Sequence, residues 1–171
     1  MVQDILIVDG YNMIGAWPSL AKLAENHLED ARDELISQLA NYQGYSGMKV
    51  ILVFDAHQVP GLGKRYNQLR VDVRYTKEKE TADECIEKLV YEWMSRRTRI
   101  YVATSDFVEQ HVIFGKGALR ISARELHVEV MESQKQLRNQ LQASNKQRWN
   151  SFENKINLDV KMMLEKWRRG K

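Results

Sequence analysis

Short runs of branched apolar residues recur along the first two thirds of this chain. The runs Ile5–Val8 and Val50–Phe54 are continuous and apolar, which is typical of strands buried on both faces of a parallel sheet. Ile100–Ala103 predicts another strand, and the alternating apolar positions of Leu69–Tyr75 predict a half-exposed strand nearer the sheet edge. The pattern therefore predicts four strands separated by other elements.

Helical signals lie between these runs. Asn26 and Glu29 have the spacing of a capping box, and so do Thr81 and Glu84. An apolar stripe at helical spacing follows each box. The stripes consist of Leu28, Ala31, Leu35, Leu39 and Tyr42, and of Ile86, Val90 and Trp93.

The pattern changes after Phe114, where no further strand is predicted. Apolar residues at spacings of three, four and seven predict one long amphipathic helix, and a shorter helix follows from about Leu158 to Arg168. We therefore expect an α/β fold with a three-layer parallel sheet, right-handed crossovers and a helical C-terminal extension. The expected division is a domain over residues 1–130 and a basic extension of the same domain over 131–171. The long stripe consists of Leu119, Ala123, Leu126, Val130, Leu137 and Leu141.

Composition narrows the class of protein. The 171 residues are 43% hydrophobic and 29% charged, which is typical of a folded domain. One cysteine, Cys85, excludes an intrachain disulfide and a thiolate zinc cluster. The longest apolar runs are far shorter than the roughly 20 residues that span a bilayer. The acidic N-terminus lacks the basic region of a signal peptide, so we expect a soluble cytoplasmic protein without a membrane partner.

Charge is unevenly distributed along the chain. Residues 121–171 carry 11 Lys and Arg against 6 Asp and Glu, whereas the first 120 residues carry 15 against 17. A basic tail behind an acidic front favours an anionic partner, of which nucleic acid is the obvious one. A solvated helical tail whose lysines only maintain solubility remains an equal alternative. The oligomeric state is not predicted.

Four aspartates occupy matching positions. Asp9 and Asp55 end the first two strands, Asp83 opens the helix after the third, and Asp106 follows the fourth. Because ligands of an open parallel sheet bind outside the carboxyl ends of its strands, we expect these carboxylates to converge. A divalent cation relieves their repulsion, and all-oxygen ligands favour Mg²⁺ or Mn²⁺. Taken singly, each aspartate also has a structural explanation: turn chemistry for Asp9 and Asp55, the helix dipole for Asp83, and a capping box with Glu109 for Asp106.

Asp83 has a further argument from helical spacing. It precedes Ile86 and Val90 by three and seven residues, which places it on the face of the buried stripe. We therefore expect its carboxylate to point at the sheet rather than at water.

Other polar residues fit a site that handles phosphate. Asn12 follows Asp9, Gly10 allows close backbone approach, and Thr104 and Ser105 offer hydroxyl and N–H groups at a helix start. A turn or cap explains Asn12 equally well. Tyr11, Trp17 and Tyr66 are candidates to stack on bases, with core packing as the alternative. Candidate phosphate-binding cations are Lys64, Arg65, Lys116, Arg120 and Arg124, the last two expected one helical turn apart.

The ordered set VDGYN, VFDAH, ETADE and VATSD, with the later segment FGKGALRISARE, resembles the NYN branch of the PIN-like nucleases, and the YacP-type group in particular. The resemblance covers about residues 4–130 and extends weakly into the tail. It implies a PIN-like fold and RNA hydrolysis with one or two Mg²⁺ or Mn²⁺ ions. The implied ligands are Asp9, Asp83 and Asp106, with Asp55 in support, and Asn12 positions water or phosphate. It further implies a ribosome-associated endoribonuclease that cuts mRNA in the ribosomal A site.

The resulting prediction is metal-assisted hydrolysis of RNA phosphodiesters, with RNA and the ribosome as partners. A haloacid-dehalogenase-like phosphatase needs a second aspartate where Tyr11 stands, and a response-regulator receiver needs an acidic pair where Asp9 stands alone. An inactive RNA- or ribosome-binding module remains as the alternative.

Overall fold

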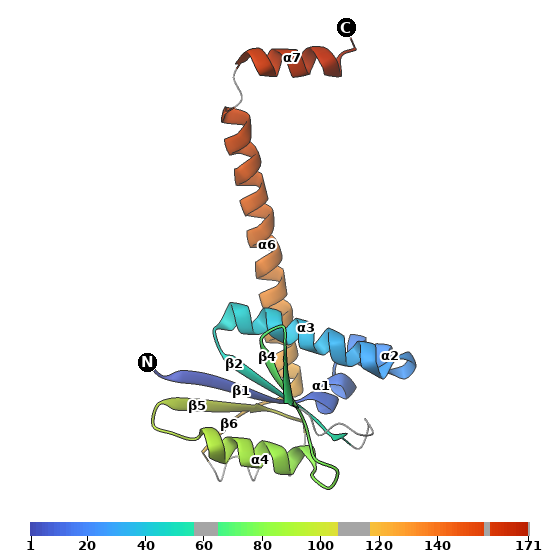
Figure 1. Cartoon of the computed structure of the whole chain (residues 1–171), viewed down its shortest axis with the longest axis vertical. Coiled ribbons are helices and arrows are strands. Elements are labelled where there is room, and N and C mark those ends of the chain that lie inside the picture. Colours follow the sequence, from blue (N-terminus) through green and yellow to red (C-terminus); the bar gives the residue numbers. More distant parts are fainter. Residues whose placement is uncertain (57–64, 106–116, 156–157, 171) are drawn as a thin grey trace. The chain divides into compact units, whose positions relative to one another are not determined.

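A six-stranded sheet forms the centre of the part of the chain that the computed structural model describes, which is residues 1–56, 65–105, 117–155 and 158–170 (Figure 1). The strand order is β3-β4-β2-β1-β5-β6. The five strands from β4 to β6 pair in parallel, and β3 adds an antiparallel strand at one edge. The strands are β1 (Gln3–Asp9), β2 (Lys49–Phe54), β3 (Arg65–Gln68), β4 (Val71–Tyr75), β5 (Thr98–Ala103) and β6 (Leu119–Ile121).

Helices cover both faces of this sheet. The α4 helix packs on one face, and α1, α3 and the beginning of α6 pack on the other (Figure 1). This arrangement confirms the predicted α/β fold with three layers. The helices are α1 (Gly10–Ala16), α2 (Pro18–Asn26), α3 (Leu28–Ser46), α4 (Ala82–Trp93), α6 (Ala123–Lys155) and α7 (Leu158–Arg168).

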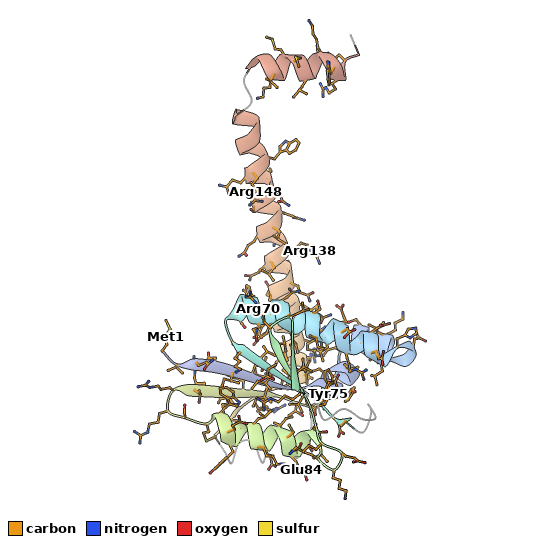
Figure 2. The ribbon with its side chains drawn as sticks, in the orientation of Figure 1. Met1, Arg70, Tyr75, Glu84, Arg138 and Arg148 are labelled. Atoms are coloured by element: carbon orange, nitrogen blue, oxygen red, sulfur yellow. The ribbon has the colours of Figure 1, made fainter. Side chains whose placement is uncertain are left out.

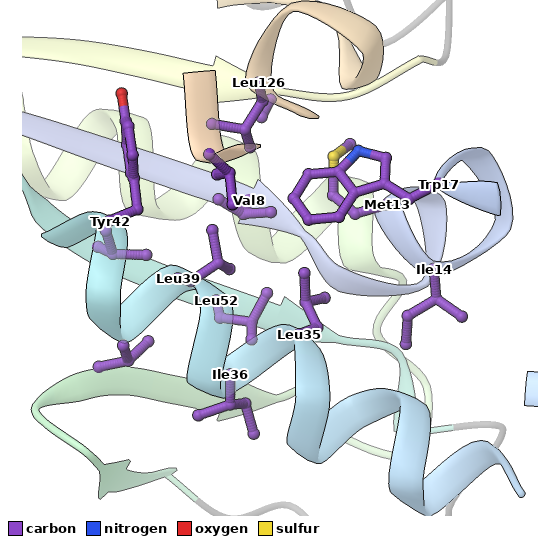
Figure 3. Close-up of a cluster of buried hydrophobic side chains, with 14 of the residues drawn as sticks. Val8, Met13, Ile14, Trp17, Leu35, Ile36, Leu39, Tyr42, Leu52 and Leu126 are labelled. Carbon is purple, nitrogen blue, oxygen red and sulfur yellow. The ribbon is translucent and has the colours of Figure 1, made fainter. Parts of the chain in front are cut away.

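The central strand β1 supplies both halves of the core. Its residues alternate between the two faces, so Leu6 and Val8 pack with α1 and α3 while Ile5 and Ile7 pack with α4. All four side chains are fully buried. Figure 3 shows the first cluster, in which Trp17 lies among side chains from the strands and the surrounding helices. Burial on both faces is the reason that this strand is continuously apolar.

Several predicted elements are confirmed. The four predicted strands correspond to β1, β2, β4 and β5, and the last helix spans Leu158–Arg168. Thr81 and Glu84 form the predicted capping box of α4: the Thr81 hydroxyl accepts from Glu84 N at 3.2 Å, and the Glu84 carboxylate accepts from Thr81 N at 3.3 Å. The N-terminus of α4 is thus capped by the side chains of Thr81 and Glu84.

Other predictions about the elements are wrong. A strand, β6, does follow Phe114, and it includes Leu119, which the apolar spacing had placed in a helix. Leu69 and Arg70 have positive φ values of 51° and 71° and form the turn between β3 and β4, so the predicted strand begins only at Val71. The short helices α1 and α2 were not predicted.

The predicted capping box at Asn26 is also wrong. Asn26 is the last residue of α2, and the N-cap of α3 is His27, whose side chain makes no capping hydrogen bond. Glu29 instead lies in the first turn of α3, where a negative charge interacts favourably with the helix dipole.

The chain divides into two compact units, Met1–Gln134 and Lys135–Lys171. This division falls close to the predicted boundary at residue 130, and the assignment of the tail to the same domain stays a prediction. Among the described residues, no helix combines the length and the apolar character that crossing a bilayer requires.

Candidate functional site

The strand order reverses direction at β1. The chain passes from β1 through β2 to β4 on one side of the sheet and then returns to place β5 on the other side of β1. The carboxyl ends of β1 and β5 therefore border the switch point at which open parallel sheets bind ligands. Asp9 is the last residue of β1, and Thr104 and Ser105 directly follow β5.

Asn12 joins the two strand ends. Asp9 is the N-cap of α1, and its carboxylate accepts a hydrogen bond from Asn12 N at 3.3 Å. The side-chain Oδ1 of Asn12 accepts from Ser105 N at 2.8 Å, across 93 residues of sequence. Thr104 is fully buried, and its N–H donates to Ile121 O of β6 at 3.3 Å. Three of the predicted site residues are thus held together by hydrogen bonds at the switch point.

Asp55 lies at the end of the neighbouring strand β2 and is half-buried. The backbone beside it is fixed by Thr76, whose hydroxyl accepts from Ala56 N at 2.9 Å and whose N–H donates to Phe54 O at 3.0 Å. Thr76 is fully buried and was missed from sequence, because a single threonine after a strand carries no distinctive pattern. Its hydrogen bonds hold the end of β2 beside the end of β4.

Asp83 does not point into the core. It lies in the first turn of α4 beside Glu84 (labelled in Figure 2), and it is exposed. The expectation of a buried carboxylate is therefore wrong. Helical spacing gives the direction of a side chain around the axis, but it does not tell whether a neighbouring layer covers that turn. An exposed carboxylate at this position is still available to a ligand.

The donor set is chemically suited to a hard divalent cation, because it consists of carboxylate and amide oxygens. Within the described residues, however, no three His, Cys, Asp or Glu side chains form a group that could hold a metal ion. Asp106, the remaining predicted ligand, follows Ser105 directly and lies outside the described residues. A complete ligand set for Mg²⁺ or Mn²⁺ thus requires Asp106 in addition to the aspartates described above, and it stays a prediction.

A row of three aromatic rings lies beside Asp9 and Asp55 at the ends of β1 and β2. Tyr11 packs on Phe54 with ring centroids 5.1 Å apart, and Phe54 stacks on Tyr75 at 5.5 Å (Tyr75 is labelled in Figure 2). Gly10 lies against the same ring: a Cβ at this position would overlap the ring carbons of Phe54. The glycine of the VDGYN motif is thus required by packing beneath the site.

Arg32 of α3 completes this row and was also missed from sequence. Its Nη1 donates to the Tyr11 hydroxyl at 3.0 Å, and only 10% of its side chain is exposed. Burial opposes the charged form, but the hydrogen bond to Tyr11 and the electrostatic influence of Tyr11, Tyr75 and Glu29 outweigh it, so the pKa of Arg32 lies above its ordinary value. A guanidinium that stays charged therefore lies beside the candidate site.

The described part of the structure does not bring the predicted phosphate-binding cations together. Lys64 and Lys116 lie outside it, and only the backbone of Arg65 is described, in β3. Arg120 and Arg124 are both exposed, but Arg120 belongs to β6 and Arg124 to α6, so the predicted one-turn stacking is wrong.

The three aromatic residues that were predicted to stack on bases have different environments. Trp17 is 1% exposed and its indole N–H donates to Ala123 O at 2.8 Å, so it is a core residue. Tyr11 lies in the aromatic row, and the side chain of Tyr66 is outside the described part.

Comparisons with known proteins extend over nearly the whole chain. A family model described as the YacP-like NYN domain matches residues 6–169. The uncharacterized protein YacP of Bacillus subtilis (strain 168) is 50% identical over 168 residues, which cover 98% of each protein. The crystal structure of Rae1 (YacP) from Bacillus subtilis has a TM-score of 0.78 at 50% identity, covering 98% of this chain and 96% of that one. A tryptophan-to-leucine variant of Rae1 has a TM-score of 0.74 at 51% identity, covering 83% of each chain.

Proposed function

Because the chain belongs to the YacP-like NYN domain family, whose members are typically nucleases, we propose that it is a divalent-metal-dependent endoribonuclease that hydrolyses phosphodiester bonds of RNA. The observation that carries this proposal is the bridge from Asp9 through Asn12 to Ser105 at the switch point of the sheet. It places a carboxylate, an amide and the backbone N–H that follows β5 where ligands of such folds bind.

The side chains have separate tasks in this proposal. Asp9 and Asp55, with Asp83 and Asp106, would hold a Mg²⁺ or Mn²⁺ ion, which when bound supplies charge neutralisation and an activated water for phosphodiester hydrolysis. Asn12 uses its Oδ1 to accept from Ser105 N, which leaves its Nδ2 hydrogens to donate to a phosphate oxygen. The buried Thr76 and Thr104 keep the strand ends fixed while the substrate binds.

We also propose that the substrate is mRNA on translating ribosomes in the cytoplasm. The family resemblance supports this substrate, and so does the basic tail: residues 135–171 contain 10 Lys and Arg against 3 Asp and Glu. Such a surface binds the phosphate backbone by releasing counterions and makes association sensitive to salt.

The test is cleavage of an mRNA in a translating extract supplied with Mg²⁺ or Mn²⁺. Wild type is compared with Asp9→Asn/Asp83→Asn, and Asp4→Asn is the matched control. Asp4 lies at the other end of β1, where Arg99 binds it at 2.7 Å, so its loss leaves the switch point intact. We expect cuts with wild type and Asp4→Asn and none with the double variant.

Two further reactions separate the alternatives. On free RNA, EDTA should abolish any cleavage, and a ribosome-free reaction shows whether the ribosome presents the substrate. RNA patterns that are identical for wild type and the folded double variant, with ribosome binding retained in both, would replace the nuclease by an RNA- or ribosome-binding module.

A further inference from the structure

The hydroxyl of Tyr11 has one unused hydrogen-bonding function. It accepts a hydrogen bond from Arg32 Nη1 at 3.0 Å. A phenol that accepts one bond still carries a proton to donate, and no acceptor for that proton is found among the described residues. Tyr11 is half-buried and lies between Asp9 and Asn12 in the sequence, and its ring packs on Phe54, the residue before Asp55. The Tyr11 side chain therefore lies beside the ends of β1 and β2, which carry Asp9 and Asp55.

Arg32 increases the strength of that donor. A hydrogen bond from a cation to the phenol oxygen draws electron density from the O–H bond, which makes its proton a better donor. The nearest carboxylate to Arg32 in the described part is Glu29, at 3.7 Å, and the Glu29 side chain is 88% exposed. An exposed ion pair at that distance compensates a buried charge weakly. The guanidinium therefore leaves positive potential at the Tyr11 end of the site.

The orientation of the hydroxyl is fixed by packing. The Tyr11 ring packs on the fully buried Phe54. Phe54 fits at this position because Gly10 has no Cβ to overlap its ring. Asn12 N donates to the Asp9 carboxylate, and Ser105 N donates to Asn12 Oδ1, so the residues that flank Tyr11 are also held in place. A donor held this firmly loses little conformational entropy when it binds a ligand.

We propose that the Tyr11 hydroxyl donates a hydrogen bond to a non-bridging phosphate oxygen of the RNA strand, and that Arg32 is the positioning residue that orients and polarises it. The proposal rests on the proposed function, because it assigns a backbone-phosphate subsite to the same site. A phosphate is the matching ligand because it accepts hydrogen bonds and carries the negative charge that Arg32 favours. Such a contact does not depend on base sequence.

Binding is measured with a fluorescein-labelled single-stranded RNA 12-mer in EDTA, by fluorescence anisotropy at 50 to 200 mM salt. Tyr11→Phe removes the hydroxyl and keeps the ring, and we expect its Kd to rise about tenfold. Arg32→Gln should raise Kd at least as much and also flatten the dependence of log Kd on log salt, since the positive charge behind the Tyr11 hydroxyl has been lost. The double variant should bind no more weakly than Arg32→Gln alone, because both act on one contact.

Matched controls come from the far parts of the same unit. Tyr91→Phe removes the hydroxyl of a tyrosine that is 81% exposed on α4, and Arg99→Gln removes an exposed arginine that binds Asp4. Both should leave Kd and the salt dependence unchanged. If Arg32→Gln does not fold, Arg32→Lys keeps the charge and should give an intermediate Kd.

Unchanged Kd in folded Tyr11→Phe overturns the proposal, even if the melting temperature falls, because the Arg32–Tyr11 pair then only joins α1 to α3. Failure of wild type to bind the 12-mer at 50 mM salt overturns it too. Cleavage by wild type in the translating extract distinguishes these results from a failure of the proposed function: with cleavage present, only the subsite is lost.

Discussion

At the scale of single residues, Gly10 is the glycine of the described part at which an added Cβ comes closest to a neighbouring atom. A Cβ at residue 10 would overlap the Phe54 ring, which is fully buried between Tyr11 and Tyr75. Gly10→Ala should therefore lower the free energy of unfolding by about 1–3 kcal/mol, because the ring must move within a packed core. Urea denaturation measures this change.

Gly15 provides the matched control in the same helix. Apart from its chain neighbours and the backbone of its own helix, no described atom lies within 4 Å of a Cβ built on Gly15, so Gly15→Ala meets open space. Its stability should stay level or rise by up to about 1 kcal/mol, as alanine is the better helix former. Equal losses for the two variants would show that flexibility rather than overlap with Phe54 is responsible.

The thiol of Cys85 should react slowly. Burial raises its pKa to about 11, with the nearby Glu80 adding to the shift. At pH 8, roughly 0.1% of the Cys85 thiol is therefore ionised, against about a quarter of a free cysteine. The thiolate is the form that reacts with alkylating agents. Alkylation with iodoacetamide should be far slower in native protein than in urea, and its rate should rise up to about pH 11. A native rate equal to that of free cysteine would contradict this environment.

The residues that could be predicted from sequence are those defined by their place on the chain. Asp9, Asn12 and Ser105 meet at the switch point because strand ends determine where they lie. Arg32 could not be found this way, since it is one of many charged residues on α3 and only the packing of Tyr11 against Phe54 brings the two together. The local sequence pattern thus predicts where a residue lies along a strand or helix, but only tertiary packing determines which side chain it contacts.

At the scale of elements, the same distinction explains which strands were predictable. β1 and β2 are continuously apolar because both faces are covered, so their sequence alone identifies them. β6 has three residues, none fully buried, and its apolar positions fit the helical spacing of α6 that follows. The turn between β3 and β4 places Leu69 and Arg70 at positive φ without glycine or asparagine, so no turn signal marks it.

Trp17 connects two elements that are remote in sequence. Its indole N–H donates to Ala123 O at the beginning of α6, and its ring lies 5.0 Å from that of His127. Trp17→Phe removes the indole hydrogen bond to the Ala123 carbonyl and opens a gap in the core shown in Figure 3. We expect a loss of about 2–4 kcal/mol in unfolding free energy, measured by urea denaturation.

The control for this change is another tryptophan. Trp167 is 77% exposed on α7, so Trp167→Phe should alter stability by no more than about 0.5 kcal/mol. RNA binding by Trp17→Phe should match wild type once the fraction of folded protein is taken into account. Weaker RNA binding by fully folded Trp17→Phe would instead support the prediction from sequence that the Trp17 ring stacks on bases.

At the scale of the whole molecule, acidic and basic functions belong to different parts of the chain. The described members of the candidate site lie in the unit Met1–Gln134, and the unit Lys135–Lys171 contains 10 Lys and Arg against 3 Asp and Glu. Every residue of the two core clusters belongs to the first unit. Folding and chemistry can therefore be separated experimentally from the attraction of an anionic partner.

A chain that ends at Gln134 should accordingly fold without the tail. We expect a cooperative thermal transition, followed by circular dichroism, within about 5 °C of the full chain, because the fully buried core is retained. Under the proposed function, its affinity for ribosomes should fall at 200 mM salt and the salt dependence of binding should flatten, since ten Lys and Arg side chains have been removed. A full-length variant with Lys161, Lys166, Arg168 and Arg169 replaced by glutamine keeps the length and should show part of the same loss. If both proteins sediment with ribosomes like wild type at every salt concentration, the basic tail serves solubility alone, and the ribosome must be recognised by the unit that carries the site.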